Sequence, residues 1–86
     1  MTQPIDVVEM FKQAAFEVDH RRLPDVRSET VIATLGMDSV AVMELVSYFE
    51  EKLSVRIPDE ELSRIKTVRD LRDAIQRLLP DKPFAA

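Results

Sequence analysis

Apolar residues recur every three or four positions in three long stretches of the chain, which is the spacing of helices that bury one face. The first stretch predicts a helix from Pro4 to about Val18, with Pro4 in its first turn. The second predicts a helix from Ser39 to Leu53, and the last predicts one from Thr67 to the residue before Pro80. The expected core-facing residues are Val8, Phe11, Ala15 and Val18, then Val42, Leu45, Val46, Phe49 and Leu53, and finally Val68, Leu71, Ile75, Leu78 and Leu79.

The residues between these stretches predict one more helix and one long loop. Pro58 suits a first helical turn, and the acidic residues after it favour a short helix over 58–63. Thr67 and Asp70 are spaced as in a capping box, with Asp in place of Glu. Proline and polar residues break the helical period over 21–34. We therefore predict an all-α fold, a four-helix bundle with three longer helices, a short third helix and a long loop between helices 1 and 2.

Length and composition bound the organisation of the chain. Its 86 residues suffice for one domain, which we place at 1–79, with a flexible C-terminal tail at 80–86. The absence of cysteine excludes disulfides, thiolate metal sites and cysteine nucleophiles. No apolar run approaches the roughly 18 residues of a membrane span, and no signal-peptide pattern opens the chain. We therefore expect a cytoplasmic protein.

The net charge of −4 is concentrated in one region of the chain. Residues 38–61 contain seven acidic residues and two basic ones, Lys52 and Arg56. This region therefore has a formal charge of −5, and the remainder of the chain has one of +1. Such an acidic patch indicates a basic protein partner and argues against nucleic acid as the ligand. A solvated helix face is the alternative interpretation. The acids are Asp38, Glu44, Glu50, Glu51, Asp59, Glu60 and Glu61.

The sequence offers few of the groups that catalysis requires. His20, the single histidine, follows the first predicted helix and is expected to be a C-terminal cap or an exposed residue. One glycine cannot build a phosphate-binding or dinucleotide-binding loop. We therefore predict that the chain is no enzyme and has neither catalytic residues nor a metal site. Since Ser39 has no evident base to activate it, we expect it to be the substrate of another enzyme.

Residues 35–40 form a turn that opens the second predicted helix. Gly36 tolerates backbone conformations closed to other residues, and both Asp38 and Ser39 are preferred at helix N-caps. A group attached to Ser39 would meet unpaired backbone N–H groups and the positive end of the helix dipole. The segment therefore predicts a phosphate site, with simple helix capping as the alternative.

Five segments follow one another at specific distances along the chain. They are Leu35-Gly36-Met37-Asp38-Ser39-Val40, Met43-Glu44-Leu45-Val46, Phe49-Glu50-Glu51, Ile57-Pro58-Asp59-Glu60-Glu61-Leu62 and Ile65-Lys66-Thr67-Val68-Arg69-Asp70-Leu71. With them the chain resembles, over nearly its whole length, the phosphopantetheine-binding acyl carrier protein family. The Gly-x-Asp-Ser core alone is moderately specific, whereas its combination with the later segments is highly specific.

This resemblance implies a covalent cofactor and a set of partner enzymes. Ser39 matches the serine that carries 4′-phosphopantetheine through a phosphodiester, and Asp38 matches the acid before it. Coenzyme A would be the donor and a separate Mg²⁺-dependent phosphopantetheinyl transferase the catalyst. The thiol of the arm would hold acyl or aminoacyl groups as thioesters, which a ligase or transferase loads and a downstream synthase or transferase uses. The resemblance thus implies a free-standing, monomeric carrier.

The resemblance also implies two surfaces around the serine. One is a partner-binding face on the second and third helices. The other is a space between these helices that shelters an acyl chain, for which ordinary core packing is the alternative. The partner-binding residues are Val40, Met43, Glu44, Glu50, Glu51 and Asp59, and the acyl-pocket residues are Phe49, Leu62, Ile65 and Ile75.

Several residues depart from the fatty-acid-synthesis type of carrier, in which acids are common at these positions. The departures make the face less acidic and favour a carrier of a dedicated pathway, such as secondary-metabolite, lipid or aminoacyl-transfer chemistry. The alternative function belongs to a different functional class: a small helical protein-interaction module with an acidic docking helix and no prosthetic group. The departing residues are Thr34, Ala41, Lys52, Arg56 and Ser63.

Overall fold

Four α-helices and one short 3₁₀ helix make up the fold of the residues that the structure describes. The computed structural model describes residues 4–20 and 25–85, so part of the predicted 21–34 loop lies outside the described residues. The elements are α1 (Val7–Asp19), η1 (Ile32–Leu35), α2 (Ser39–Leu53), α3 (Asp59–Leu62) and α4 (Val68–Leu78). The predicted all-α bundle, with its short third helix, is therefore confirmed. No helix in this part of the chain is long and apolar enough to cross a membrane.

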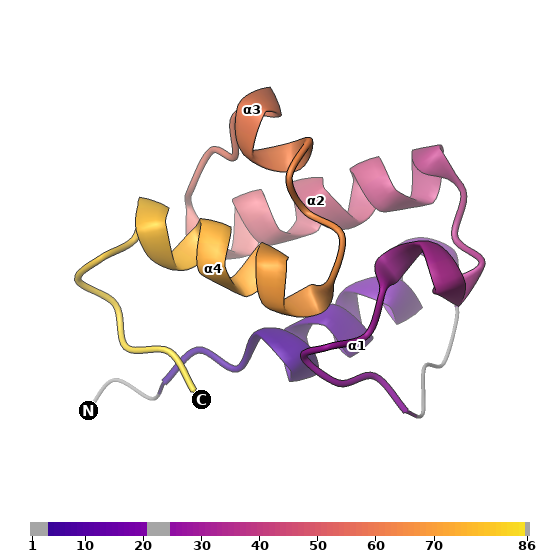
Figure 1. Cartoon of the computed structure of the whole chain (residues 1–86), viewed down its shortest axis with the longest axis horizontal. Coiled ribbons are helices and arrows are strands. Elements are labelled where there is room, and N and C mark those ends of the chain that lie inside the picture. Colours follow the sequence, from indigo (N-terminus) through magenta and orange to yellow (C-terminus); the bar gives the residue numbers. More distant parts are fainter. Residues whose placement is uncertain (1–3, 21–24, 86) are drawn as a thin grey trace.

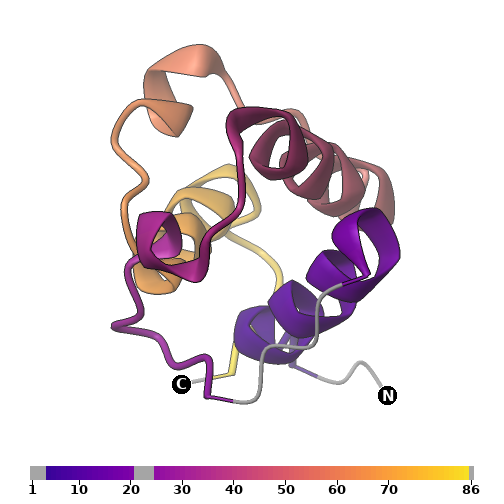
Figure 2. The same cartoon turned by 90° about the vertical axis from the view of Figure 1, so that its right-hand side faces the viewer.

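The three longer helices enclose the core. α1 packs against both α2 and α4. Figure 1 shows α3 beside α2 and α4, and Figure 2 shows the helices from the end at which α2 begins. Each of the longer helices contributes large side chains that are withdrawn from solvent, which ties the elements into one bundle. The largest fully buried side chains are Phe11 of α1, Leu45 and Phe49 of α2, and Val68, Leu71 and Ile75 of α4.

A side chain caps the N-terminus of each longer helix. Asp6 accepts a hydrogen bond from the Glu9 amide, and Asp38 accepts one from the Ala41 amide. These acceptors satisfy N–H groups that have no partner within the helix and place negative charge at the positive end of its dipole. Because Asp6 caps α1, that helix begins at Val7, and the predicted start at Pro4 is wrong.

α4 begins with the predicted capping box. The Asp70 amide donates to Thr67 Oγ1 at 3.1 Å, while Asp70 Oδ2 accepts from the Lys66 and Thr67 amides at 3.0 and 3.1 Å. The amides of Lys66 and then Thr67 lower the pKa of Asp70 below its ordinary value of 3.8, because they stabilise the charged carboxylate. The contribution of Asp70 to stability is thus present above pH 3.8 and is lost as the pH falls through the lowered pKa.

We therefore expect Asp70→Ala to lower the free energy of unfolding by about 1 kcal/mol at pH 7, the usual cost of a lost cap. The deficit should shrink as the pH falls below 3.8 through the lowered pKa of Asp70, because the wild-type carboxylate then also loses its charge. Urea unfolding at pH 7 and at successively lower pH values measures the difference. Asp81→Ala, which removes an exposed carboxylate, is the matched control and should change little. A deficit independent of pH would contradict the charged cap.

The segment between α1 and α2 is anchored to the start of α4. Val31 forms an isolated antiparallel bridge with Thr67, and the Ile32 amide donates to the Lys66 carbonyl at 2.9 Å. The Val68 amide donates in turn to the Thr30 carbonyl at 3.1 Å. This anchoring holds η1, which the sequence pattern did not predict, beside the N-terminal half of α2.

The C-terminal segment, predicted as a flexible tail, lies against the N-terminal segment in the structure. The Ile5 amide donates to the Pro83 carbonyl at 2.9 Å, and the Ala85 amide donates to the Ile5 carbonyl at 2.8 Å. Phe84, the bridge partner of Ile5, is half-buried against the core. The backbone of residues 80–85 thus has a defined position in the structure. The predicted flexibility of the tail stays a prediction.

Candidate functional site

The turn before α2 places Ser39 at the surface. Gly36 adopts the left-handed conformation with φ 76°, and the side chain of Met37 is buried in the core. Asp38 is extended, and its Oδ1 accepts a hydrogen bond from the Ala41 amide at 2.7 Å. Asp38 is therefore the N-cap, and Ser39 is the first residue of the helix. The sequence left the capping role open between these two residues, and the structure assigns it to Asp38.

This assignment leaves the polar atoms of Ser39 available. Its side chain is exposed and forms no hydrogen bond within residues 4–20 and 25–85. The backbone N–H groups of Ser39 and Val40 likewise have no acceptor among these residues. Such N–H groups at the start of a long helix favour an anion. The residues present therefore fit a phosphate joined to the Ser39 hydroxyl.

A cavity of about 550 Å³ borders Ser39 on one side. We call it the inner cavity. It lies between η1, α2, α3 and the start of α4, and its lining is almost wholly apolar. Its volume is in the range of small-molecule sites. The lining residues are Val31, Ile32, Ala33, Met37, Ser39, Val42, Met43, Leu45, Val46, Leu62, Ile65, Lys66 and Leu71.

The four predicted acyl-pocket residues separate into two groups. Leu62 and Ile65 line the inner cavity. Phe49 and Ile75 do not line it, and both are fully buried in the core. Their burial supports the alternative interpretation as ordinary core, and their assignment to the acyl pocket stays a prediction. Sequence analysis missed the contribution of η1, although the apolar run Val31-Ile32-Ala33 within a loop is a signal that could have indicated it.

The predicted partner-binding face spans α2 and the start of α3. Val40 and Met43 are 65% and 54% exposed, which decides between a core role and a surface role in favour of the surface. Glu44, Glu51 and Asp59 are also exposed. Exposed apolar side chains among acids on one helix form a surface of the kind that proteins use for recognition.

Two residues of α2 differ from their expected placement. Glu50 is half-buried, and its carboxylate accepts a hydrogen bond from the Ile57 amide at 2.7 Å, so it holds the segment before α3 in place. Ala41 is only 6% exposed and belongs to the core. The alanine at position 41 therefore does not affect the charge of the surface. The other departing residues are exposed as expected, namely Thr34, Lys52, Arg56 and Ser63.

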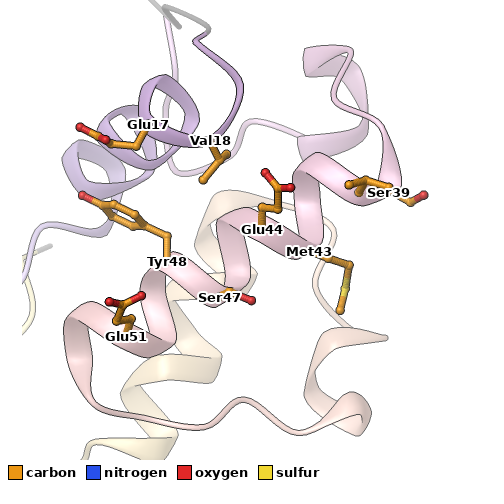
Figure 3. A pocket seen from close by; sticks show the side chains of 9 residues that line it. Glu17, Val18, Ser39, Met43, Glu44, Ser47, Tyr48 and Glu51 are labelled. Atoms are coloured by element: carbon orange, nitrogen blue, oxygen red, sulfur yellow. The ribbon is translucent and has the colours of Figure 1, made fainter.

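A second hollow borders Ser39 on the side of α1. This groove of about 640 Å³, which we call the outer groove, lies between the end of α1 and the outward face of α2 (Figure 3). Tyr48 points from α2 toward α1, whose Glu17 and Val18 border the same groove. No sequence pattern predicts this groove, because it depends on the packing of two helices. Its lining residues are Glu17, Val18, Ser39, Val40, Met43, Glu44, Ser47, Tyr48 and Glu51.

No cluster of three or more potential metal ligands occurs in the described part of the chain. His20 is exposed, ends α1 in the left-handed conformation, and donates its backbone N–H to Ala15 and Phe16 carbonyls. Its ring lies edge-on to that of Phe16. The predicted role of His20 as a C-cap is confirmed.

Comparison with known proteins extends the likeness from the serine to most of the chain. The family model described as the phosphopantetheine attachment site matches residues 11–75, which include Ser39, all of α2 and α3, and most of α1 and α4. The chain belongs to the acyl carrier protein family. Family membership decides against the alternative of an interaction module without a prosthetic group. Acyl carrier proteins are non-catalytic carriers whose cofactor is phosphopantetheine.

Individual acyl carrier proteins are similar to this one over different lengths. That of Helicobacter hepaticus is 55% identical over 40 residues, which are 46% of this chain and 53% of the relative. The meromycolate extension acyl carrier protein of Mycobacterium leprae is 36% identical over 58 residues, 67% of this chain and 50% of the relative. This chain thus spans about half the length of these relatives.

A solved structure supports the fold over a larger share of this chain. The crystal structure of the acyl carrier protein of Thermotoga maritima matches with a TM-score of 0.79 at 36% identity, covering 87% of this chain and 88% of the other. The bundle described above is therefore that of an acyl carrier protein. Members of the family interact with a phosphopantetheinyl transferase and with biosynthetic enzymes.

Proposed function

We propose that Ser39 is the attachment residue and that the chain carries acyl or aminoacyl intermediates between enzymes. The observation that carries this proposal is the exposed Ser39 hydroxyl at the start of α2, beside N–H groups without acceptors, in a chain of this family. Phosphopantetheine, when bound, supplies a thiol that forms thioesters with the cargo. Tethering raises the effective concentration of the cargo for each partner enzyme.

The residues around Ser39 have separate tasks in this proposal. Asp38 caps the first turn of α2 through its bond to the Ala41 amide, which holds the backbone of Ser39 at the start of the helix. The Ser39 and Val40 N–H groups would hold the phosphate by donating to its oxygens, and the dipole of α2 would stabilise their charge. Asp38 is exposed, so it is accessible to a visiting transferase.

Intact-mass measurement tests the proposal. Incubation of the protein with coenzyme A, Mg²⁺ and a promiscuous phosphopantetheinyl transferase should add one phosphopantetheine, roughly 340 Da from its covalent composition. Peptide mapping should then place the added mass on the segment that contains Ser39. An unchanged mass, or an addition elsewhere, would refute the assignment.

We further propose that the inner cavity shelters an apolar acyl chain attached through Ser39. Leu62 and Ile65 line this cavity opposite α2, and burial of methylene groups against them is favourable by about 0.8 kcal/mol each. Amide hydrogen exchange should therefore be slower at Leu62 and Ile65 in an acylated form than in the form with a free thiol. Equal exchange in both forms would count against sequestration.

The partner-binding face is proposed to dock basic enzymes, with Val40 and Met43 as its apolar contacts and the acids as its steering charges. Glu44→Lys should slow association with the transferase by roughly threefold to tenfold at low salt, since steering acts mainly on the association rate. The effect should diminish at high salt because of screening. Glu29→Lys, an equal charge change at an exposed loop residue, is the control for stopped-flow measurements. Equal rates for both variants would contradict this face.

The carrier is proposed to serve a dedicated pathway in the cytoplasm as a free-standing monomer. The exposed Lys52, Arg56, Ser63 and Thr34 support this, because they reduce the acidity of the surface. Similarity to a carrier named for meromycolate extension supports it too, although the relatives from Helicobacter hepaticus and Thermotoga maritima bear the general name. If a general malonyl transferase of fatty acid synthesis loaded this protein as efficiently as a ligase encoded beside it, the dedicated role would be excluded.

A further inference from the structure

Two hollows of different chemistry meet at Ser39. Both the inner cavity and the outer groove are lined by Ser39 and by Met43, one turn further along α2. Met43 is 54% exposed and belongs to the borders of both hollows, so it stands between them. An arm that leaves Ser39 therefore has two surfaces within reach, and their chemistry decides which of them it contacts.

The outer groove combines apolar and polar groups along α2. Val18 and Val40 provide apolar surface, while Ser47 and Tyr48 provide hydroxyls. These hydroxyls, like the Glu44 and Glu51 carboxylates on the same border, form no hydrogen bond or ion pair within the part of the chain that the structure describes. The ring of Tyr48 is held by Lys52, whose Nζ lies 5.5 Å from the ring centroid. The groove thus presents positioned, unused donors and acceptors.

We propose that the phosphopantetheine arm, when it carries no long apolar cargo, rests in the outer groove. This proposal rests on Ser39 as the attachment residue. The groove extends along α2 from Ser39 to Glu51, a rise of about 18 Å. The covalent chain of the arm is about as long as five residues of extended peptide, roughly 17 Å. The groove is therefore long enough to hold the whole arm.

The chemistry of the arm favours the groove over the inner cavity. The arm contains two amides and a hydroxyl, and burial of such groups without hydrogen bonds is costly. The lining of the inner cavity offers them few partners, because apart from Ser39 and Lys66 its side chains are apolar. In the groove, amide N–H groups can donate to the Glu44 and Glu51 carboxylates, and amide carbonyls can accept from the Ser47 and Tyr48 hydroxyls. The geminal methyl groups of the arm contact Val18 and Val40.

The composition of the chain permits a site-specific test. Because the protein has no cysteine, the thiol of the arm is its only thiol once it is loaded, and a maleimide nitroxide labels it alone. Tyr48 is the only tyrosine and there is no tryptophan, so tyrosine fluorescence reports on the groove itself. Successful loading is first established by mass, which separates a failure of the attachment proposal from a failure of this one.

In the labelled protein, the amides of Val18, Ser47 and Tyr48 should lose NMR intensity, and the emission of Tyr48 should be quenched. Ascorbate reduction of the nitroxide should restore both signals. Intensity loss at Leu62, Ile65 and Leu71 instead would place the arm in the inner cavity and overturn the proposal. Loaded protein without a localised loss would overturn it as well, because the arm would then remain in solvent.

A pair of variants separates occupancy of the groove from nonspecific contact. Glu44→Phe should fill the groove and abolish the intensity loss at Val18 and Tyr48. Glu60→Phe makes the same change of charge and size at an exposed residue of α3 that borders neither hollow, and it should preserve the loss. Heteronuclear spectra of both variants before labelling report their folding. Persistence of the loss in Glu44→Phe with intact folding would refute the proposed contacts.

Discussion

A Ser39→Ala variant is expected to gain no mass on incubation with coenzyme A, Mg²⁺ and a phosphopantetheinyl transferase, whereas the wild type gains one phosphopantetheine. The substitution removes the proposed attachment oxygen and leaves the cap intact, because the Ala41 amide donates to Asp38 and not to Ser39. Alanine is also the most favourable helix residue. The far-ultraviolet circular dichroism of the variant should therefore match that of the wild type.

The matched control is Ser47→Ala, at another exposed serine of α2. It should be modified to completion, since Ser47 lies two turns away from the helix start and lacks the free N–H groups of the first turn. Intact-mass spectra of the three proteins, recorded over time, distinguish loss of the site from slower modification. Modification of Ser39→Ala would disprove the assigned residue.

A Phe49→Ala variant should lose about 3 to 5 kcal/mol of unfolding free energy, the usual cost of removing a buried aromatic side chain. Phe49 is 0% exposed and lies at the centre of the core formed by α1, α2 and α4. A domain of this size has a stability of only about 5 to 15 kcal/mol, so the variant should be partly unfolded at moderate temperature. Urea unfolding followed by circular dichroism measures the loss.

Val40→Ala provides the comparison for this cavity effect. Val40 is on the same helix but is 65% exposed, so its truncation should change stability by no more than about 0.5 kcal/mol. A loss below about 1 kcal/mol for Phe49→Ala would mean that the core collapses around the vacancy or that Phe49 is not central to it. The same result would support its assignment to the acyl pocket.

The long helices were predictable because local chemistry and periodicity agree in them. The bounds predicted for α2 match the structure, since a capping residue and a sustained apolar stripe coincide there. Ala41 shows the limit of this reasoning. It belongs to the buried residues of α2, yet a small side chain carries little weight in an apolar pattern. Its burial is decided by the close approach of neighbouring elements.

The hollows around Ser39 were only partly predictable. The spacing of apolar residues identifies which of them share a helix face. It does not distinguish a residue packed in the middle of the core from one that lines a cavity. Leu62 and Phe49 illustrate this, because both were assigned to one pocket and only Leu62 lines it. The outer groove depends on how far α1 and α2 diverge, which no local pattern specifies.

Pairing between distant segments also escaped prediction. Ile5 and Phe84 form a single bridge, which has too few residues to produce an alternating pattern. The same holds for Val31 and Thr67. Such isolated pairings depend on the whole bundle bringing the two segments together.

The bridge between Ile5 and Phe84 brings the two ends of the described chain together, and Figure 1 shows both ends far from the start of α2. A tether or surface handle joined there would leave the serine end of the bundle facing outward. A short linker could also join the ends, so that a circular permutant cut in an exposed loop would keep the same helices. The molecule is therefore suited to immobilisation on a bead or grafting onto a scaffold, with the end that carries Ser39 left accessible.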